Sequence, residues 1–359
     1  MKPSDEGKGP HRGGGLMGNQ IRFGVIGGGI RGAMFAGVIA EHPRSELIAF
    51  CETAPAVAER LGEHFGVPVH GDLDRFFDEE LDAVVIATPD FAHREPGLAA
   101  LQHGVDVLFE KPLATTREDA LTLQAAAAES SSRVMLGFEN RWNPTFRRAR
   151  ERLTDAGSTL IAQRVLLSDT EFVPRSMFGW ADRSTPGWFL FPHTLDLAMW
   201  LSGSRPTEVF ARGVKKVLAP DGIDTYDRIS ASLSMSDGSL LDLASGWVSP
   251  TSRPSVFQFR YGIEAAGLEM DLEIDRGGST SYDSDTISYL HGPDRDHRGR
   301  LTGPAIEMMR DFIDLCDGAD LDVPGLDTGL QVTLALATLH DALESNSNLR
   351  IHYTEGQPS

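Results

Sequence analysis

An apolar segment that runs straight into a glycine-rich turn constrains this chain more than any other feature. Residues 21–26 (IRFGVI) are followed by the turn residues Gly27, Gly28, Gly29, Ile30, Arg31 and Gly32, a G-x-G-x-x-G pattern. Gly27 permits the tight turn, Gly29 lets a phosphate approach the backbone, and Gly32 lets a helix pack closely on the strand. The start of that helix offers free N–H groups and a partial positive charge. The turn therefore predicts a dinucleotide site formed by residues 27–31.

A second apolar run, residues 47–51, ends at Glu52, 20 residues after Gly32. An acid at this distance is expected to accept hydrogen bonds from the ribose hydroxyls of the dinucleotide. It also repels a 2′-phosphate, and the next residues, Thr53, Ala54 and Pro55, bring no positive charge. The expected cofactor is NAD, in preference to NADP.

The first part of the chain alternates short apolar runs with helical stretches. The runs cover residues 21–26, 46–51, 83–87, 105–109 and 133–138. Alternation of this kind predicts a parallel sheet covered on both faces, so we assign residues 21–143 to a Rossmann domain. Thr115 and Glu118 have the spacing of a capping box, which predicts a helix that runs to about residue 129. A further helix after Pro144 is expected to stop at Gly157.

The order of predicted strands and helices changes in residues 144–359. Strand-like segments at 159–168, 228–235, 239–244, 256–261 and 268–274 follow one another with one helix, 186–201, among them. The chain closes with helical patterns at 304–316 and 327–345. We therefore expect an α/β protein whose C-terminal α+β domain contains a large, mostly antiparallel open sheet. The polar stretch 275–303 is the best candidate for a mobile or oligomer-specific loop.

Composition excludes several classes of partner. The 359 residues carry a net charge of −19, which disfavours binding to nucleic acid and to anionic membranes. Cys51 and Cys316 are the only cysteines, so we expect no disulfide framework, no metal site and a reducing, cytoplasmic setting. Residues 1–20 are polar and glycine-rich without a signal-peptide core, and we expect a disordered tail there. No apolar run is long enough for a membrane helix.

Two further strands are expected to place polar residues at the carboxyl edge of the parallel sheet, where ligands bind. The strand at 83–87 is followed by Thr88 and Pro89, which should line the cofactor cleft, and then by His93. His93 either faces the ligand or caps a helix, and we favour the cap. The strand at 105–109 is followed by Glu110 and Lys111. Position alone makes Lys111 a surface lysine in a turn.

These segments together resemble one family, the Gfo/Idh/MocA oxidoreductases, which include glucose–fructose oxidoreductase and inositol dehydrogenases. The most specific match is Glu110-Lys111-Pro112 within residues 104–116, which is similar to the family's E-K-P signature. Residues 87–93, 137–144 and 192–196 match three further family patterns, and the resemblance covers nearly the whole chain after residue 20. It implies a Rossmann domain followed by a domain whose open sheet carries the substrate site and often the oligomer interface. A homodimer or homotetramer through that sheet is therefore expected.

The resemblance also assigns chemistry to particular residues. It implies that Lys111 and His193 are catalytic. The residues expected to line the nicotinamide end of the cofactor site are Glu110, Lys111, Asn140 and Arg141. A buried lysine beside the cationic oxidised ring should have a lowered pKa and shuttle a proton near neutral pH. His193 would take the proton from a substrate hydroxyl as hydride leaves the carbon.

One position departs from the family pattern. Many members carry an aspartate four residues before this histidine, and here that residue is Phe189. Asp182 and Asp196 are the nearby candidates to replace it. Aromatic side chains around the site either stack on a sugar ring or belong to the core. The candidate substrate residues are Lys111, Arg141, Trp180, Asp182, Trp188, His193 and Asp196.

The sequence thus predicts an NAD-dependent oxidoreductase that transfers hydride between the nicotinamide and a secondary alcohol or ketone of a sugar, cyclitol or related polyol. Two alternatives stay open at this point. The chain is otherwise a dinucleotide-binding sensor without redox turnover, or a lyase or glycosidase that uses bound NAD transiently. Retention of both Lys111 and His193 argues against the sensor, whereas the missing aspartate keeps that alternative open.

Overall fold

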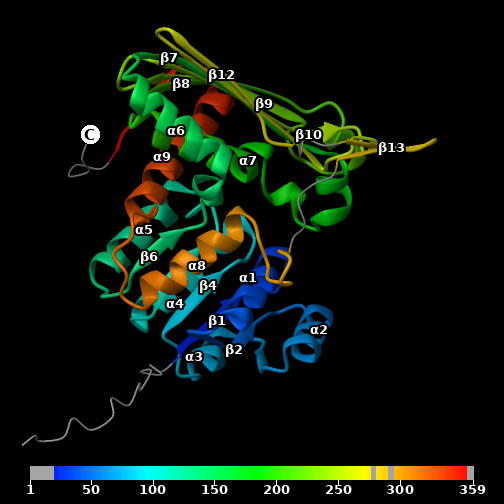
Figure 1. Ribbon diagram of the computed structural model, residues 1–359, viewed down its shortest axis with the longest axis vertical. Coiled ribbons are helices and arrows are strands. Elements are labelled where there is room, and N and C mark those ends of the chain that lie inside the picture. Colours follow the sequence, from blue (N-terminus) through cyan, green and yellow to red (C-terminus); the bar gives the residue numbers. More distant parts are fainter. Residues whose placement is uncertain (1–19, 276–279, 290–294, 354–359) are drawn as a thin grey trace, which may run out of the picture.

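The computed structural model describes residues 20–275, 280–289 and 295–353, and arranges them around two sheets (Figure 1). The first sheet is parallel, as expected, and its short strands are almost entirely apolar because both faces are covered. Its strand order is β3 (Val69–His70), β2 (Ser45–Cys51), β1 (Ile21–Ile26), β4 (Ala83–Ile86), β5 (Asp106–Phe109) and β6 (Val134–Leu136). The prediction of a Rossmann domain is confirmed.

The helices that follow these strands cover the sheet. They are α1 (Ile30–Glu41), α2 (Pro55–Phe65), α3 (Leu73–Phe77), α4 (Arg94–Gln102) and α5 (Arg117–Ala128), with short 3-10 turns η1 (Asp90–Ala92) and η2 (Glu139–Trp142). The predicted capping residue of α5 was wrong by one position. Thr116, not Thr115, accepts the hydrogen bond, from Asp119 N at 3.1 Å, because the helix begins at Arg117.

One late helix belongs to the first sheet rather than the second. Helix α8 (Pro304–Cys316) lies beside α1 in Figure 1, although we placed residues 144–359 together in the C-terminal domain. Its apolar face, including Met308 and Phe312, is buried in the core that contains Phe23 and Phe35. Burial of this face against α1 and the sheet explains why a distant helix returns to the first domain.

The second sheet is mixed but mostly antiparallel, as expected. Its order is β12 (Leu268–Glu273), β11 (Phe257–Ala265), β7 (Leu160–Thr170), β10 (Leu240–Ser249), β9 (Arg228–Met235), β8 (Pro206–Val214) and β15 (Leu349–Arg350). Only β7 and β10 pair in parallel among these strands of the described chain. The sequence analysis did not identify β8, whose polar Glu208 and Arg212 interrupt the apolar pattern.

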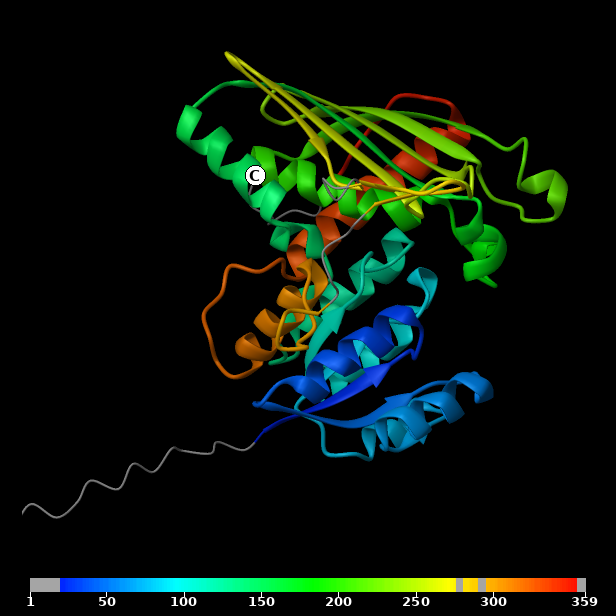
Figure 2. The same ribbon diagram turned by 45° about the vertical axis from the view of Figure 1, so that its right-hand side comes forward.

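Helices cover one face of this second sheet. They are α6 (Pro144–Ala156), α7 (Pro186–Ser202) and α9 (Leu326–Ser345), and the short turns η3 (Val173–Met177), η4 (Ala181–Arg183) and η5 (Ala219–Asp221) join the strands. Helix α6 ends as predicted at Gly157, which has a φ of 56°. Figure 2 shows α7 and α9 between the second sheet and the first domain, with the other face of the sheet free of helices. The face toward α7 is therefore the one that builds the interior.

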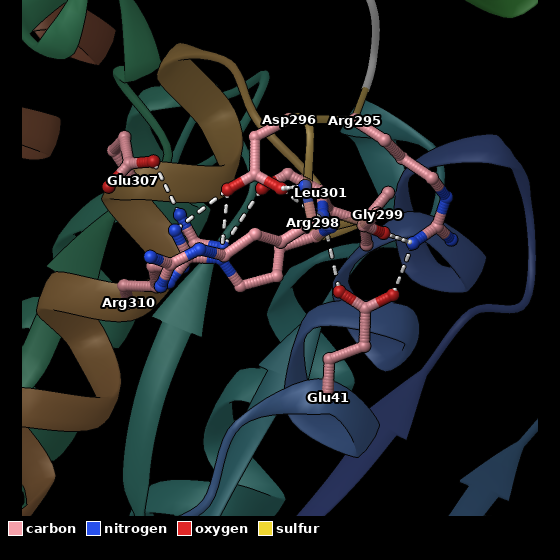
Figure 3. A network of polar contacts seen from close by, with 9 residues as sticks. Glu41, Arg295, Asp296, Arg298, Gly299, Leu301, Glu307 and Arg310 are labelled. Atoms are coloured by element: carbon pink, nitrogen blue, oxygen red, sulfur yellow. Dashed lines mark hydrogen bonds and ion pairs between the residues drawn. The ribbon is translucent and has the colours of Figure 1, made fainter.

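The stretch 275–303, which we expected to be a mobile or oligomer-specific loop, is partly described. It contains an exposed hairpin, β13 (Thr280–Tyr282) and β14 (Ile287–Tyr289), whereas residues 276–279 and 290–294 lie outside the described chain. Residues 295–301 bind the first domain in Figure 3. Arg295 Nη1 lies 2.5 Å from Glu41 Oε1, Leu301 N donates to Glu41 Oε2 at 3.2 Å, and Arg310 Nη2 donates to Leu301 O at 2.9 Å. This end of the stretch is held between α1 and α8.

Candidate active site

The glycine turn after β1 has the geometry that a dinucleotide requires. Gly27 has a φ of 92°, and a Cβ there would lie 2.7 Å from the carbonyl of Ala87. A Cβ on Gly32 would overlap the carbonyl oxygen of Gly27, so the first turn of α1 packs directly on the turn. Gly29 has no atom within 4 Å of its Cβ position. The start of α1 is therefore open on the side from which a phosphate would approach.

Glu52 lies beside this turn at the end of β2. Its Oε2 accepts a hydrogen bond from Gly28 N at 2.7 Å, and its Oε1 accepts one from Ala54 N at 2.8 Å. These bonds hold the carboxylate next to the open start of α1. Glu52 is thus placed where an acid would meet the ribose of a bound dinucleotide.

His93 does not cap α4, so the favoured interpretation was wrong. It precedes the helix, but its side chain makes no capping hydrogen bond. The buried ring instead lies between two carbonyl oxygens, with Nδ1 2.7 Å from Pro112 O and Nε2 3.1 Å from Thr88 O. Burial lowers the pKa of His93. Its ring ties the loop after β4, with Thr88 and Pro89, to the loop after β5.

Arg31 connects the glycine turn to the loop that carries Lys111. Its Nε donates to Glu110 Oε1 at 2.7 Å, and its Nη2 lies 3.6 Å from Glu139 Oε2. Glu110 Oε2 in turn accepts a hydrogen bond from Lys111 N at 3.1 Å. Ile30, beside Arg31, is 69% exposed, although its side chain is large and apolar. The cofactor turn and the Glu110-Lys111 loop therefore form one charged network.

Lys111 is buried, with 8% of its surface exposed. Its Nζ donates to Phe189 O at 2.9 Å and lies 4.2 Å from the centre of the Phe189 ring. Burial lowers the pKa of Lys111, whereas Glu110, Glu139 and Asp90 raise it. The lysine is thus not the surface residue that its position in a turn suggests. The missing aspartate at position 189 is replaced by an aromatic ring and a backbone carbonyl.

His193 lies one helical turn beyond Phe189 on α7. Its Nδ1 is 3.4 Å from Asn140 Nδ2 and 3.5 Å from Glu139 Oε2. Within the described residues Nε2 makes no hydrogen bond. Burial, followed by the charge of Lys111, lowers the pKa of His193 well below its usual value. The imidazole is therefore neutral at neutral pH and has one ring nitrogen free.

Arg141 and Asp196 bind each other. Arg141 Nε and Nη2 donate to the two carboxylate oxygens at 2.9 and 2.6 Å. Burial raises the pKa of Asp196 against the opposing effect of Arg141. A bidentate, buried pair of this kind fastens η2 to α7. The pair also helps to position His193, because η2 carries Asn140 and Glu139, the two residues that lie next to His193 Nδ1.

The remaining candidates lie in two places. Trp180 stacks on Phe178, with ring centres 4.4 Å apart, and lies 6.2 Å from the ring of Phe189. Trp188 points to the other side of α7, where it stacks on His340 with ring centres 4.5 Å apart. Asp182 is exposed and lines the same separate pocket as Trp188. The structure therefore does not bring Trp188 and Asp182 to His193.

A cavity of about 800 Å³ lies between the two domains and is large enough for a small polar ligand. We call it the interdomain cavity. It is lined by the start of α1, η2, β7, β11, α7 and the start of α8. The polar side chains of its lining include Arg31, Glu139, Asn140, Asp169 and His193. Lys111 reaches this wall through Phe189, which lines the cavity. Among the described residues no group of three acidic, histidine or cysteine side chains is arranged to hold a metal ion.

Sequence reasoning missed two of these cavity residues, Glu139 and Asp169. Glu139 lies within the residue 137–144 segment that matches the family, so proximity to Asn140 and Arg141 is a signal that points to it. Asp169 stands near the end of a predicted strand, in the run Leu167-Ser168-Asp169-Thr170, with no motif around it. Only the fold shows that this part of β7 faces α7.

Two family models match the chain. Residues 21–138 match the oxidoreductase family with an NAD-binding Rossmann fold, and residues 174–267 match the GFO/IDH/MocA C-terminal domain. These two matches fall on the two sheets described above. Within the described residues no helix is long and apolar enough to cross a bilayer.

Individual relatives agree with these matches. The chain is 26% identical to 2,7-anhydro-N-acetylneuraminate hydratase of Mediterraneibacter gnavus, over 75% of this chain and 72% of the relative. It is 23% identical to inositol 2-dehydrogenase of Rhizobium meliloti, over 90% and 97% of the two chains. The fold matches a crystal structure of scyllo-inositol dehydrogenase from Lactobacillus casei with bound NAD(H) and scyllo-inositol. That match has a TM-score of 0.79, 21% identity, and coverage of 93% and 99%.

Proposed function

Because the chain belongs to the GFO/IDH/MocA oxidoreductase family, we propose that it is an NAD-dependent dehydrogenase or reductase of a polyhydroxylated substrate. The reacting group is a secondary alcohol or ketone of a sugar, cyclitol or related polyol. One observation carries the proposal: the open start of α1, the buried amine of Lys111 and the neutral ring of His193 are joined through one network at the interdomain cavity. Relatives named as inositol and UDP-sugar dehydrogenases support this substrate class.

The chain's own residues supply binding and proton transfer. NAD, when bound, would supply the hydride acceptor, which the side chains of the protein lack. Residues 27–31 would hold the pyrophosphate and Glu52 the ribose. Burial lowers the pKa of both Lys111 and His193, so a larger share of each is present as the neutral base near neutral pH. His193, through its free Nε2, would remove the proton of the substrate hydroxyl. Lys111 would transfer a proton at the nicotinamide end of the site.

The preference for NAD over NADP is part of this proposal. The carboxylate of Glu52 is fixed by Gly28 N and Ala54 N, so it does not swing away from the ribose position. A 2′-phosphate would meet that negative charge, and Thr53 offers no cation in return.

We also propose that the enzyme is a homodimer or homotetramer that pairs through the outer face of the second sheet. No described helix covers this face, as both ribbon views show. Its strands present small and apolar side chains there, such as Ala244 and Leu166, between the charged side chains of Arg164 and Asp242. Mixed surfaces of this kind are typical of subunit interfaces.

The cytoplasm is the proposed compartment. Cys51 and Cys316 are both free thiols. Burial raises the pKa of Cys51 to about 11 and also raises that of Cys316. Two protonated, inert thiols fit a reducing environment.

A substrate screen tests the proposed activity. Purified enzyme is mixed with NAD and, in turn, with inositols, aldoses and UDP-sugars, while the absorbance of NADH and the formation of product are both followed. A dehydrogenase gives one NADH for each product molecule. Product without NADH would instead indicate transient oxidation, as in a lyase or hydratase, and tight NAD binding without product would indicate a sensor.

A further inference from the structure

The interdomain cavity contains a carboxyl group with one buried oxygen that has no hydrogen-bond partner in the described part of the chain. Asp169, on β7, is 6% exposed and lines the cavity together with Phe189 and His193. Its Oδ2 is buried and makes no hydrogen bond within the described residues. A buried polar atom without a partner destabilises the folded chain, and more so if it is charged. Such a group calls for an explanation, and a ligand in the cavity that supplies the missing bond is one.

The surroundings of Asp169 fit a group that binds substrate rather than one that stabilises the fold. Apolar side chains of Leu167 and Phe259 stand beside it on the same cavity wall. The indole N–H of Trp247 is the nearby donor, and it lowers the pKa of the carboxyl as a weak hydrogen bond does, but neither Trp247 Nε1 nor Asp169 Oδ2 makes a hydrogen bond of ordinary geometry within the described residues. No arginine or lysine forms an ion pair with Asp169 among the described residues. Its position is set by β7, not by a salt bridge.

We propose that Asp169 accepts a hydrogen bond from a hydroxyl group of the polyol bound in the interdomain cavity. This inference rests on the proposed function and adds to it a residue that selects hydroxylated substrates. A neutral C–H or ether at that point would leave the carboxylate unpaired, which discriminates strongly against analogues that lack the hydroxyl. Because Phe189 and Phe259 make the wall around it apolar, this one bond would also fix the orientation of the sugar or cyclitol ring.

A hydrogen bond that Asp169 accepts from a substrate hydroxyl makes kcat/KM depend on pH. Burial raises the pKa of Asp169 to about 7, although Lys111 and Trp247 lower it. The other charged or titratable groups at the cavity are Arg31 and Glu139 on the first domain and His193 on α7. Below neutrality Asp169 gains a proton and becomes a weaker acceptor for the substrate hydroxyl. The value of kcat/KM should therefore fall on the acid side of pH 7.

The test compares two substitutions of Asp169 with a control. Asp169→Asn keeps the shape and removes the charge, and Asp169→Leu removes all polar atoms. Glu171→Gln makes the same charge change two residues away, where the side chain pairs with Arg175 outside the cavity wall. We expect both Asp169 variants to lower kcat/KM by ~10- to 100-fold, mainly through KM, and the acid limb near pH 7 to disappear. The control should keep both.

Two further measurements separate this proposal from a structural role and from the proposed activity. Thermal unfolding of Asp169→Leu should occur at the same or a higher temperature, because a buried unpaired carboxyl has been removed. Infrared titration of the ligand-free enzyme should show a carboxyl band near neutral pH that Asp169→Asn abolishes, and this result needs no turnover. If wild-type enzyme turns over a polyol and Asp169→Asn matches it in KM and pH profile, the inference is wrong. If wild-type enzyme turns over no polyol, the proposed function fails while the infrared titration still reports on Asp169.

Discussion

The glycine turn is built from neighbouring elements of the first domain, mainly β1, the start of α1 and the end of β2. The interdomain cavity, by contrast, is lined by six elements that span residues 30–306. At the turn, Glu52 and Gly28 bind each other and every backbone contact is local to the first sheet. In the cavity, His193 approaches Glu139 across 54 positions of sequence, and Asp169 comes from a different sheet. The two regions meet where Arg31 binds Glu110.

This difference shows how the two regions can change. The turn depends on backbone shape, so only glycine fits at Gly27 and Gly32, and the cofactor class is fixed by few positions. The cavity depends on side chains that separate elements hold in place, so one residue such as Phe189 can replace an aspartate without loss of the fold. The comparison therefore predicts that changes at the turn alter cofactor choice, whereas changes at the cavity alter chemistry.

The largest effect is expected from Asp196→Ala, which breaks the pair that holds η2 to α7. Asp196 is 1% exposed, and its loss leaves Arg141 buried without its partner. The free energy of unfolding should fall by about 3–5 kcal/mol. Urea denaturation, with the exposed Asp182→Ala as control, measures this. Equal stability of the two variants would show that the pair does not support the cavity.

Lys111→Ala should then lower kcat by ~100-fold or more, because a positioned proton-transfer group is lost. The enzyme should still fold and should bind NADH with little change, since the turn contacts do not include the Lys111 amine. Stopped-flow kinetics and NADH fluorescence titration measure the two quantities. Near-normal turnover across neutral pH would show that Lys111 takes no part in proton transfer. Proton transfer and substrate binding in the cavity would then depend on His193 and Asp169.

A change at the turn should act on cofactor choice alone. Glu52→Ser combined with Thr53→Arg removes the negative charge and adds a cation, so the ratio of NADP to NAD affinity should rise about tenfold or more. The KM for polyol should not move. Fluorescence titration with both reduced cofactors checks this, and wild-type enzyme that binds NADPH as well as NADH would contradict the assignment of Glu52.

The smallest effect is expected from Phe189→Asp. A carboxylate at this position would favour the protonated forms of Lys111, His193 and Asp169, so the pKa of each rises and the acid limb of kcat/KM moves to higher pH. Phe189→Leu removes the ring contact with Lys111 without adding charge, and it separates the two causes. An active Phe189→Asp enzyme with an unmoved acid limb would show that none of these three groups controls this limb.

The same contrast explains what the sequence could predict. Periodicity and glycine spacing predicted both sheets, the glycine turn and the neighbouring Glu52 that we propose to bind the cofactor, because those features are encoded within a few residues. The resemblance added Lys111 and His193. It did not reveal that α8 returns to the first sheet, since only the complementary apolar face of that helix determines where it packs. Nor did it separate Trp188 from Trp180, which depends on the side of α7 that each aromatic ring faces.

Asp169 could not be predicted as a cavity residue from the sequence. Its strand was predicted to end at residue 168, and the strand continues to Thr170, so Asp169 was left outside it. One end of β7 lines the interdomain cavity and the other does not. The alternation of apolar and polar residues in a strand does not show which polar residue faces a cavity. Burial without a hydrogen-bond partner is a property of the folded chain, and it is the observation that singles this aspartate out.

The central claim is that a polyol in the interdomain cavity transfers hydride to NAD. Myo-inositol deuterated on its ring carbons provides the direct measurement, with mass spectrometry of the cofactor recovered after turnover by the wild-type enzyme; any polyol found in the screen serves in the same way. The account predicts NADH that carries one deuterium on the nicotinamide ring for each ketone formed. Product accompanied by unlabelled cofactor would contradict it.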